Sequence, residues 1–201
     1  MLVIISGPSG SGKGTVVGKI DREDCAHSIS VTTREKRPGE EHGVHYFFTT
    51  KEDFIERRQR GEFLEHAEFV GNLYGTPKDY VEGKIAEGKA VILEIDVVGA
   101  LQIKEKFEDC ILIFLIPPTM ADLKKRLQGR STEDEATINR RVKRANFEIE
   151  YFEKYDYLVI NDEVEETVSK IHTIIASEYL KPSRNQNFIH AIRNEIKGDE
   201  V

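Results

Sequence analysis

Short apolar runs alternate with helix-like segments along most of the chain. Four runs have the length of a buried strand, and each is bounded by Gly, Pro, Asp or Asn: Leu2–Ser6, Ala90–Ile95, Ile111–Ile116 and Tyr157–Ile160. Continuous apolar strands that alternate with helices are typical of a parallel sheet covered by helices on both faces. The pattern therefore predicts an α/β fold.

The clearest helix is expected from about Glu163. Asn161 and Asp162, just before it, offer side chains that could cap its N-terminus. Its apolar residues recur at helical spacing: Val164, Val168, Ile171 and Ile175.

Residues from about 31 to 88 follow a different pattern. Short strands are expected at Tyr46–Phe48 and Glu62–Phe69, with a hairpin turn at Gly71-Asn72. This segment predicts an inserted lobe of mixed structure. Residues 129–144 are polar and charged, which indicates a mobile connection leading into a helix. The tail, residues 181–201, has apolar residues at helical spacing and predicts an amphipathic helix that packs on the body or on a partner.

The composition is that of an ordinary soluble protein of one domain. The chain has 201 residues, 39% hydrophobic and 32% charged, and its net charge is −7. Such an acidic chain is a poor general binder of nucleic acid or anionic membranes. No apolar run approaches the roughly 20 residues that span a bilayer, and the start lacks a signal-peptide pattern. We therefore expect a cytoplasmic protein with Cys25 and Cys110 as reduced thiols, and no nucleic-acid or membrane partner. The oligomeric state stays open, a homo-oligomer included.

The strongest local signal is a glycine-rich loop between the first strand and a helix. Residues 7–15 read GPSGSGKGT, which in this context predicts a phosphate-binding P-loop. Glycines let several backbone N–H groups point at one anion, and the helix adds its positive N-terminal end. Lys13 supplies a point charge for the terminal phosphates. The ATP-binding residues expected in the loop are Ser9, Gly10, Ser11, Gly12, Lys13, Gly14 and Thr15.

One residue departs from the usual loop. The position after the lysine normally carries Ser or Thr, whose hydroxyl binds Mg²⁺, but here it is Gly14. We expect Thr15 to hydrogen-bond a phosphate, and Mg²⁺ to be held with ATP through water, phosphates and a carboxylate. Asp96 is the best candidate carboxylate, acting through water, because ligands in such sheets bind beyond the carboxyl ends of strands. Its alternative role is the N-cap of the next helix.

A P-loop identifies a nucleotide phosphate but not the reaction, and the small size favours a nucleoside monophosphate kinase. Such a kinase needs an acceptor site. Arg34 and Arg37 lie three residues apart in the loop Ser30–Glu40, where they could grip a phosphate in bidentate fashion. On charge alone, a solvated loop explains them equally well.

The chain resembles the guanylate kinases, which phosphorylate GMP with ATP, from about Leu2 to Leu180. The resemblance depends on the P-loop and Ser30–Glu40 in combination with further segments, since no single later segment is specific. The further segments are Tyr46, Glu62–Glu65, Gly71–Thr76, Leu93–Asp96 and Leu127–Glu133.

The resemblance implies a P-loop core with a parallel sheet, a GMP-binding lobe and a short lid within a single domain. The core would be about 1–30, 89–128 and 145–180, the lobe about 31–88 and the lid about 129–144, with 181–201 as the tail. The GMP-binding residues would be Ser30, Arg34, Arg37, Tyr46, Glu65, Tyr74, Thr76 and Asp96. The catalytic residues would be Lys13, Arg126, Arg130 and Arg141, and Asn161 would lie near the adenine of ATP.

The chemistry of guanine fits Glu65. Guanine presents its N1–H and 2-amino donors side by side, so one ionised carboxylate accepts both, whereas adenine would leave that carboxylate short of partners. Spacing alone also allows Glu65 to face solvent on an antiparallel strand. The transfer needs no covalent intermediate and no general base, because the GMP phosphate is already anionic and the enzyme's task is positioning and neutralisation of charge.

Three residues depart from the pattern of the family. Glu94 stands where many members carry Asp, Val98 where many carry Gln, and His45 where an acidic residue is common. Activity on GMP and dGMP is still expected, because Lys13 and Glu65 are retained.

Two alternatives stay open. One is a sugar-phosphate kinase on the same scaffold, which would have no use for Glu65, Ser30 and Thr76 as readers of guanine. The other is a non-catalytic guanylate-kinase-like binding module, which the intact Lys13 disfavours. Arg126 could also belong to a solvated helix face formed with the two lysines before it.

Overall fold

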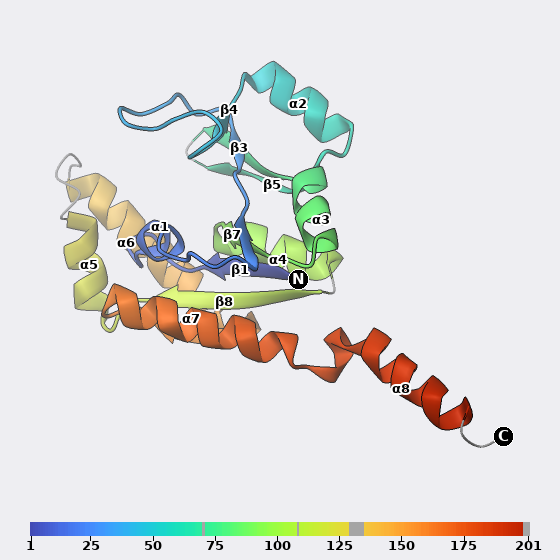
Figure 1. Cartoon of the computed structure of the whole chain (residues 1–201). Helices are drawn as coiled ribbons and strands as arrows, with labels where there is room; N and C mark the ends of the chain where they lie inside the picture. Colours follow the sequence, from blue (N-terminus) through green and yellow to red (C-terminus); the bar gives the residue numbers. More distant parts are fainter. Residues whose placement is uncertain (70, 108, 129–134, 199–201) are drawn as a thin grey trace.

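The computed structural model describes residues 1–69, 71–107, 109–128 and 135–198, which form two sheets with flanking helices (Figure 1). The larger sheet has the strand order β2-β7-β1-β8-β9, and all its neighbouring strands are parallel. The predicted α/β fold is confirmed. The strands are β1 (Leu2–Ser6), β2 (Cys25–His27), β7 (Ala90–Glu94), β8 (Cys110–Ile116) and β9 (Tyr157–Ile160).

Alternate residues of β1 serve the two faces of this sheet. Val3 and Ile5 pack in a core with apolar residues of α1 and α7, whereas Leu2 and Ile4 pack in a second core with residues of α3 and α4. Both faces of the sheet are therefore buried under helices, which explains why the central strands are mostly apolar. The four helices are α1 (Lys13–Val17), α3 (Lys78–Ala86), α4 (Val97–Lys106) and α7 (Val164–Tyr179).

The N-terminus of α7 differs from the sequence-based expectation. Its N-cap residue is Glu163, and no side chain caps the helix. The prediction that Asn161 or Asp162 would cap it is wrong. The Asn161 side chain instead bonds the P-loop, because its amide nitrogen donates to the backbone of Ser11.

The second sheet has the order β4-β3-β6-β5 and lies above the P-loop end of the larger sheet (Figure 1). Its strands β5 and β6 are antiparallel and pair Phe69 with Asn72, so the predicted hairpin is present. Gly71 in that turn has φ of +76°, which glycine adopts without strain. The elements are β3 (Val31–Thr32), β4 (Phe47–Phe48), α2 (Lys51–Gln59), β5 (Phe63–Phe69) and β6 (Asn72–Pro77).

The remaining elements complete one side of the core and the tail. Of the residues expected to form a mobile connection, 135–144 belong to α6, and 129–134 lie outside the described residues. The predicted tail helix is present as α8, which extends away from the body in Figure 1. No helix among the described residues is long and apolar enough to cross a bilayer. The elements are α5 (Met120–Gln128), α6 (Glu135–Ile149), η1 (Phe152–Lys154), η2 (Pro182–Arg184) and α8 (Gln186–Gly198).

Candidate functional site

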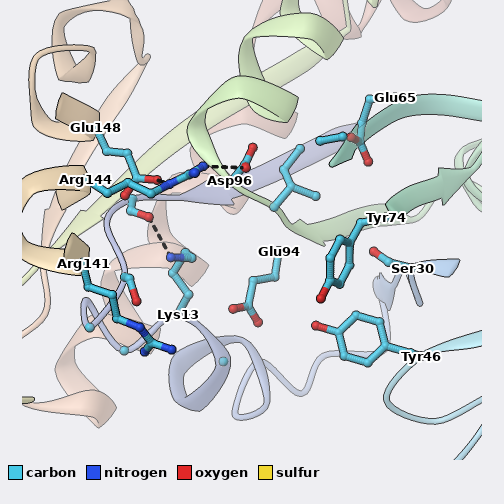
Figure 2. Close-up of a pocket in the computed structure, with 17 residues that line it drawn as sticks. Lys13, Ser30, Tyr46, Glu65, Tyr74, Glu94, Asp96, Arg141, Arg144 and Glu148 are labelled. Carbon is cyan, nitrogen blue, oxygen red and sulfur yellow. Dashed lines mark hydrogen bonds and ion pairs between the residues drawn. The ribbon is translucent and has the colours of Figure 1, made fainter. Parts of the chain in front are cut away.

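A pocket of about 280 Å³ lies between the two sheets, beyond the carboxyl ends of β1 and β7 (Figure 2). The P-loop borders it on one side and the second sheet on the other, while α6 supplies a third wall. This is the edge at which parallel sheets bind ligands. The lining residues are Gly7, Ser9, Gly10, Gly12, Lys13, Gly14, Ser30, Tyr46, Glu65, Ala67, Tyr74, Glu94, Ile95, Asp96, Arg141, Arg144 and Glu148.

Two glycines give the P-loop its course. A Cβ on Gly7 would lie 2.1 Å from the carbonyl oxygen of Leu115, so no side chain fits where the loop leaves β1. Gly12 has φ of +87°, and a Cβ there would lie 2.5 Å from the amide nitrogen of Asn161. These positions require glycine because the backbone approaches its neighbours too closely for any other residue.

Two of the positive charges that line the pocket, Lys13 and Arg141, lie on the side of the P-loop. The Lys13 ammonium donates to the carbonyl oxygens of Gly7 at 2.7 Å and Pro8 at 3.2 Å, so the loop itself orients it. Arg141 of α6 lines the same side of the pocket (Figure 2). Arg126 of α5 lies next to the loop, outside the lining, and donates to the backbone oxygen of Asn161 at 3.0 Å.

Asn161 supports the P-loop from beneath. Its side chain is buried, its amide nitrogen donates to the carbonyl oxygen of Ser11 at 2.7 Å, and its amide oxygen accepts from the hydroxyl of Thr167 at 3.1 Å. The residue therefore joins the loop to α7. Its expected place near adenine is untested and stays a prediction.

The opposite wall holds a buried carboxyl group. Glu65 on β5 is only 4% exposed, and one of its oxygens accepts from the Thr76 hydroxyl at 2.7 Å. The pKa of Glu65 is raised from 4.5 to about 7. Burial is the largest cause of this raised pKa, the hydrogen bond from Thr76 acts against it, and the nearby charge of Asp96 adds to the increase. Ser30 lies on the same wall (Figure 2). A carboxyl group with so few partners is suited to accept donors from a ligand.

Two tyrosines separate this carboxyl group from the loop that carries the predicted phosphate arginines. The rings of Tyr46 and Tyr74 line the pocket edge to face, with centroids 6.1 Å apart. Burial raises the pKa of Tyr46, and the negative charge of Glu94 raises it further. Tyr46 therefore stays protonated, and its hydroxyl can donate a hydrogen bond to a phosphate oxygen.

The predicted phosphate arginines do not line the pocket in this structure. Arg34 donates to both carboxylate oxygens of Glu40, at 2.7 and 3.0 Å, and its guanidinium lies 5.4 Å from the ring centre of Tyr46. The backbone N–H of Arg37 donates to the same carboxylate at 2.8 Å. The Arg34 hydrogen bonds lower the pKa of Glu40 to about 2. Glu40 thus holds this loop together by binding the Arg34 guanidinium, the same positive group that a ligand phosphate would bind.

Sequence reasoning did not single out two of the charged residues lining the pocket, Arg144 and Glu148. Arg144 donates to Glu148 at 2.9 Å and to Asp96 at 3.2 Å. Asp96 also caps α4, because it accepts from the N–H of Gly99 at 2.9 Å, so its alternative role is present. The available signal was the spacing of Arg141, Arg144 and Glu148, which puts all three on one face of a helix.

The structure brings most of the predicted site residues to this pocket. Glu94, noted only as a departure, lies in Figure 2 between Lys13 and the tyrosines, and its carboxylate is 3.5 Å from where a Cβ of Gly14 would be. Arg130 lies outside the described residues. The predicted residues that line the pocket are Ser9, Gly10, Gly12, Lys13, Gly14, Ser30, Tyr46, Glu65, Tyr74, Asp96 and Arg141. Those that do not are Ser11, Thr15, Arg34, Arg37, Thr76, Arg126 and Asn161.

Comparison with known proteins points in one direction. The family model for guanylate kinase matches residues 1–178. A guanylate kinase from Oceanobacillus iheyensis is 50% identical over 186 residues, which cover 92% of this chain and 90% of that protein. One from Thermotoga maritima is 43% identical over 199 residues, covering 98% and 96%. The crystal structure of a guanylate kinase from Anaplasma phagocytophilum superposes with a TM-score of 0.76 at 35% identity, covering 92% of this chain and 88% of that one.

Proposed function

The chain belongs to the guanylate kinase family and phosphorylates GMP with ATP, and we propose that the two walls of its pocket each bind one of these substrates. The observation that carries this division is a single pocket lined both by Lys13 of the P-loop and by the buried carboxyl group of Glu65. The ATP phosphates would lie against Lys13 and the guanine ring against Glu65. The phosphate of GMP would then point toward the γ-phosphorus of ATP.

The P-loop wall is assigned to ATP. Backbone N–H groups of residues 9–15 would cradle the β-phosphate, and Lys13 would turn from the loop carbonyls to the terminal phosphates. Arg126 and Arg141 would add positive charge from α5 and α6, and Arg130 would join them from the lid. Asn161 would hold the loop in place close to the adenine.

The opposite wall is assigned to GMP. The N1–H and 2-amino groups of guanine would donate to ionised Glu65, whose orientation the Thr76 hydroxyl fixes at 2.7 Å. Ser30 and Asp96 would complete the base site. The phosphate would take donors from the two tyrosines and from Arg34 and Arg37. We extend the proposal to dGMP, because it offers the same base and phosphate.

The transfer itself is a single displacement. A phosphate oxygen of GMP forms a bond to the γ-phosphorus of ATP while the bond from that phosphorus to the β–γ bridging oxygen breaks, which yields GDP and ADP. Lys13 and the arginines neutralise the charge on the moving phosphoryl group. Closure of the lobe and lid would exclude water, which would otherwise accept the phosphoryl group in place of GMP.

Mg²⁺ with ATP is part of the proposal, and the side chains fit a hydrated ion. Within the described ranges there is no group of three or more His, Cys, Asp and Glu side chains that could cage a metal. Asp96 would act through water, since it already accepts from Gly99 and Arg144. Glu94 offers a second carboxylate near the loop. Bound there, the ion would supply positive charge beside the phosphates of ATP.

We also propose that the enzyme acts in the cytoplasm, where ATP and GMP are available. Its net charge of −7 disfavours binding to nucleic acid, so small molecules are its proposed partners.

A coupled assay for ADP formation tests the proposed function. ADP should form with Mg²⁺-ATP and GMP or dGMP, and much more slowly with AMP or ribose 1,5-bisphosphate. A preference for the bisphosphate would favour the sugar-phosphate kinase instead. Calorimetric titrations with ATP and with GMP test the non-catalytic binding module. That alternative would be supported if the protein bound GMP but not ATP and showed no turnover.

A further inference from the structure

Arg144 lies where two cavities meet. It lines the nucleotide pocket and also a second cavity of about 400 Å³ between α4, β5 and α6, and Asp96 lines both as well. Figure 2 shows the Arg144 side chain reaching from α6 across to Asp96, at the end of the pocket nearest Glu65. The ion pair between them therefore separates the base end of the pocket from the second cavity.

Arg144 fixes the orientation of the Asp96 carboxylate. One nitrogen of its guanidinium donates to Oδ2 of Asp96 at 3.2 Å, while Oδ1 accepts from the backbone N–H of Gly99 at 2.9 Å. Each carboxylate oxygen thus has one donor, and its remaining lone pairs stay available to a ligand. Without Arg144 only the helix cap would hold Asp96, whose side chain is 28% exposed and has room to rotate.

Glu148 in turn fixes Arg144. It lies four residues later on the same face of α6, is 5% exposed, and accepts from Nε of Arg144 at 2.9 Å. A carboxylate this deeply buried strongly favours a paired cation. Glu148 therefore directs the planar guanidinium toward the junction of β7 and α4 rather than toward solvent.

The base end of the pocket requires such a cation. Oε2 of Glu65 and Oδ1 of Asp96 approach the same point beside Gly99, since a Cβ there would lie 3.0 and 3.5 Å from them. Two carboxylates this close repel each other, so a positive charge beside Asp96 helps the Gly99 N–H to hold the more exposed one in place.

We propose that Arg144, held by Glu148, is a positioning residue for the acceptor base, because it keeps the Asp96 carboxylate beside Glu65 where guanine donors meet both. The inference rests on the proposed function of the pocket. It assigns to α6 a part in recognition of the base, in addition to the phosphate role of Arg141.

The test compares Arg144→Met with Lys143→Met, a change at an exposed neighbour on the same helix. Steady-state kinetics with GMP and with IMP, which lacks the 2-amino group, separate base recognition from turnover. We expect Arg144→Met to raise KM for GMP by about tenfold or more, while KM for ATP and kcat change by less than about threefold. Its preference for GMP over IMP should narrow, and Lys143→Met should behave as the wild type.

Removal of Arg144 leaves Glu148 buried without its partner, which could unfold the protein. The double variant Arg144→Met with Glu148→Met removes both charges together and replaces them with apolar groups of similar size. It should fold and show the same selective loss with GMP. The inference is overturned if KM for GMP is unchanged. It is also overturned if kcat/KM falls equally for GMP, IMP and ATP, so that the preference for GMP over IMP stays intact. A wild type that does not phosphorylate GMP would overturn the proposed function instead.

Discussion

Replacement of Glu65 by Gln should raise the free energy of unfolding of the substrate-free protein and lower kcat/KM for GMP. The carboxyl group of Glu65 is 4% exposed, and it accepts a hydrogen bond from the Thr76 hydroxyl. Gln keeps the size of the side chain and the oxygen that accepts from Thr76, but it carries no charge. The change therefore isolates the effect of ionising a carboxyl group in this position.

The magnitude follows from the pKa of Glu65. Burial raises it from 4.5 to about 7, so the folded state binds the proton more tightly than the unfolded chain. The free energy of unfolding then falls as pH rises through the interval from 4.5 to 7, and the loss is complete at about pH 8. At roughly 1.4 kcal/mol for each pH unit, ionised Glu65 destabilises the fold by about 3 kcal/mol. For a chain of this size, that corresponds to roughly 6–12 °C in Tm.

Urea denaturation of the substrate-free wild type and the Glu65→Gln variant at pH 5 and pH 8 measures this effect. The variant should exceed the wild type by about 3 kcal/mol at pH 8 and by much less at pH 5. Glu68→Gln, an exposed carboxylate on the same strand, is the matched control and should show no such difference. Equal differences between variant and wild type at both pH values would refute the reasoning.

Activity should move in the opposite direction. An amide presents one donor to a guanine edge that itself offers two donors, so one charge-assisted hydrogen bond is lost and a second is weakened. Each is worth about 1.5–3 kcal/mol, and kcat/KM for GMP should fall by about 10²-fold or more. A variant that gained stability at pH 8 but kept its activity on GMP would separate the burial of Glu65 from its role in reading guanine.

Three further predictions concern the P-loop. Lys13→Met should lower kcat by about 10³-fold with an unchanged circular dichroism spectrum, because it removes the charge that faces the γ-phosphate; turnover near the wild-type value would contradict the loop assignment. Gly12→Ala should weaken ATP binding by calorimetry by about tenfold or more, since a Cβ there meets Asn161 at 2.5 Å and φ is +87°. Asn161→Ala should lower the free energy of unfolding by about 1–3 kcal/mol in urea, because the buried carbonyl of Ser11 loses its donor; Asp162→Ala, at the exposed next position, is the control and should change it little.

The main strands could be predicted from the sequence because their physical cause is local. β1 and β8 are buried on both faces, so every residue except Ser6 at the end of β1 is apolar and the runs stand out. β2 was not predicted, since its three residues, Cys25–His27, are only half-buried and lack such a run. It forms because β7 offers it a free edge, which no local pattern reveals.

The candidate site divides in the same way. The P-loop has a fixed spacing, so Lys13 could be named from the sequence alone. Arg144 could not, because in a charged helix one arginine resembles another until tertiary structure brings Asp96 within 3.2 Å. The capping error at Asn161 has a similar origin: its amide had a distant partner in the P-loop that took precedence over the adjacent helix.

The spacing of Arg141 and Arg144 on α6 has a consequence for the order of events in the catalytic cycle. In the proposed arrangement Arg141 would face the donor phosphates and Arg144 would position the acceptor-base site, and both are carried by the same helix, α6. A movement of α6 that brings one of these arginines to its ligand would therefore also move the other. Under this proposal α6 would make its full set of contacts only when both nucleotides are bound, and one nucleotide alone would engage only one of the two arginines.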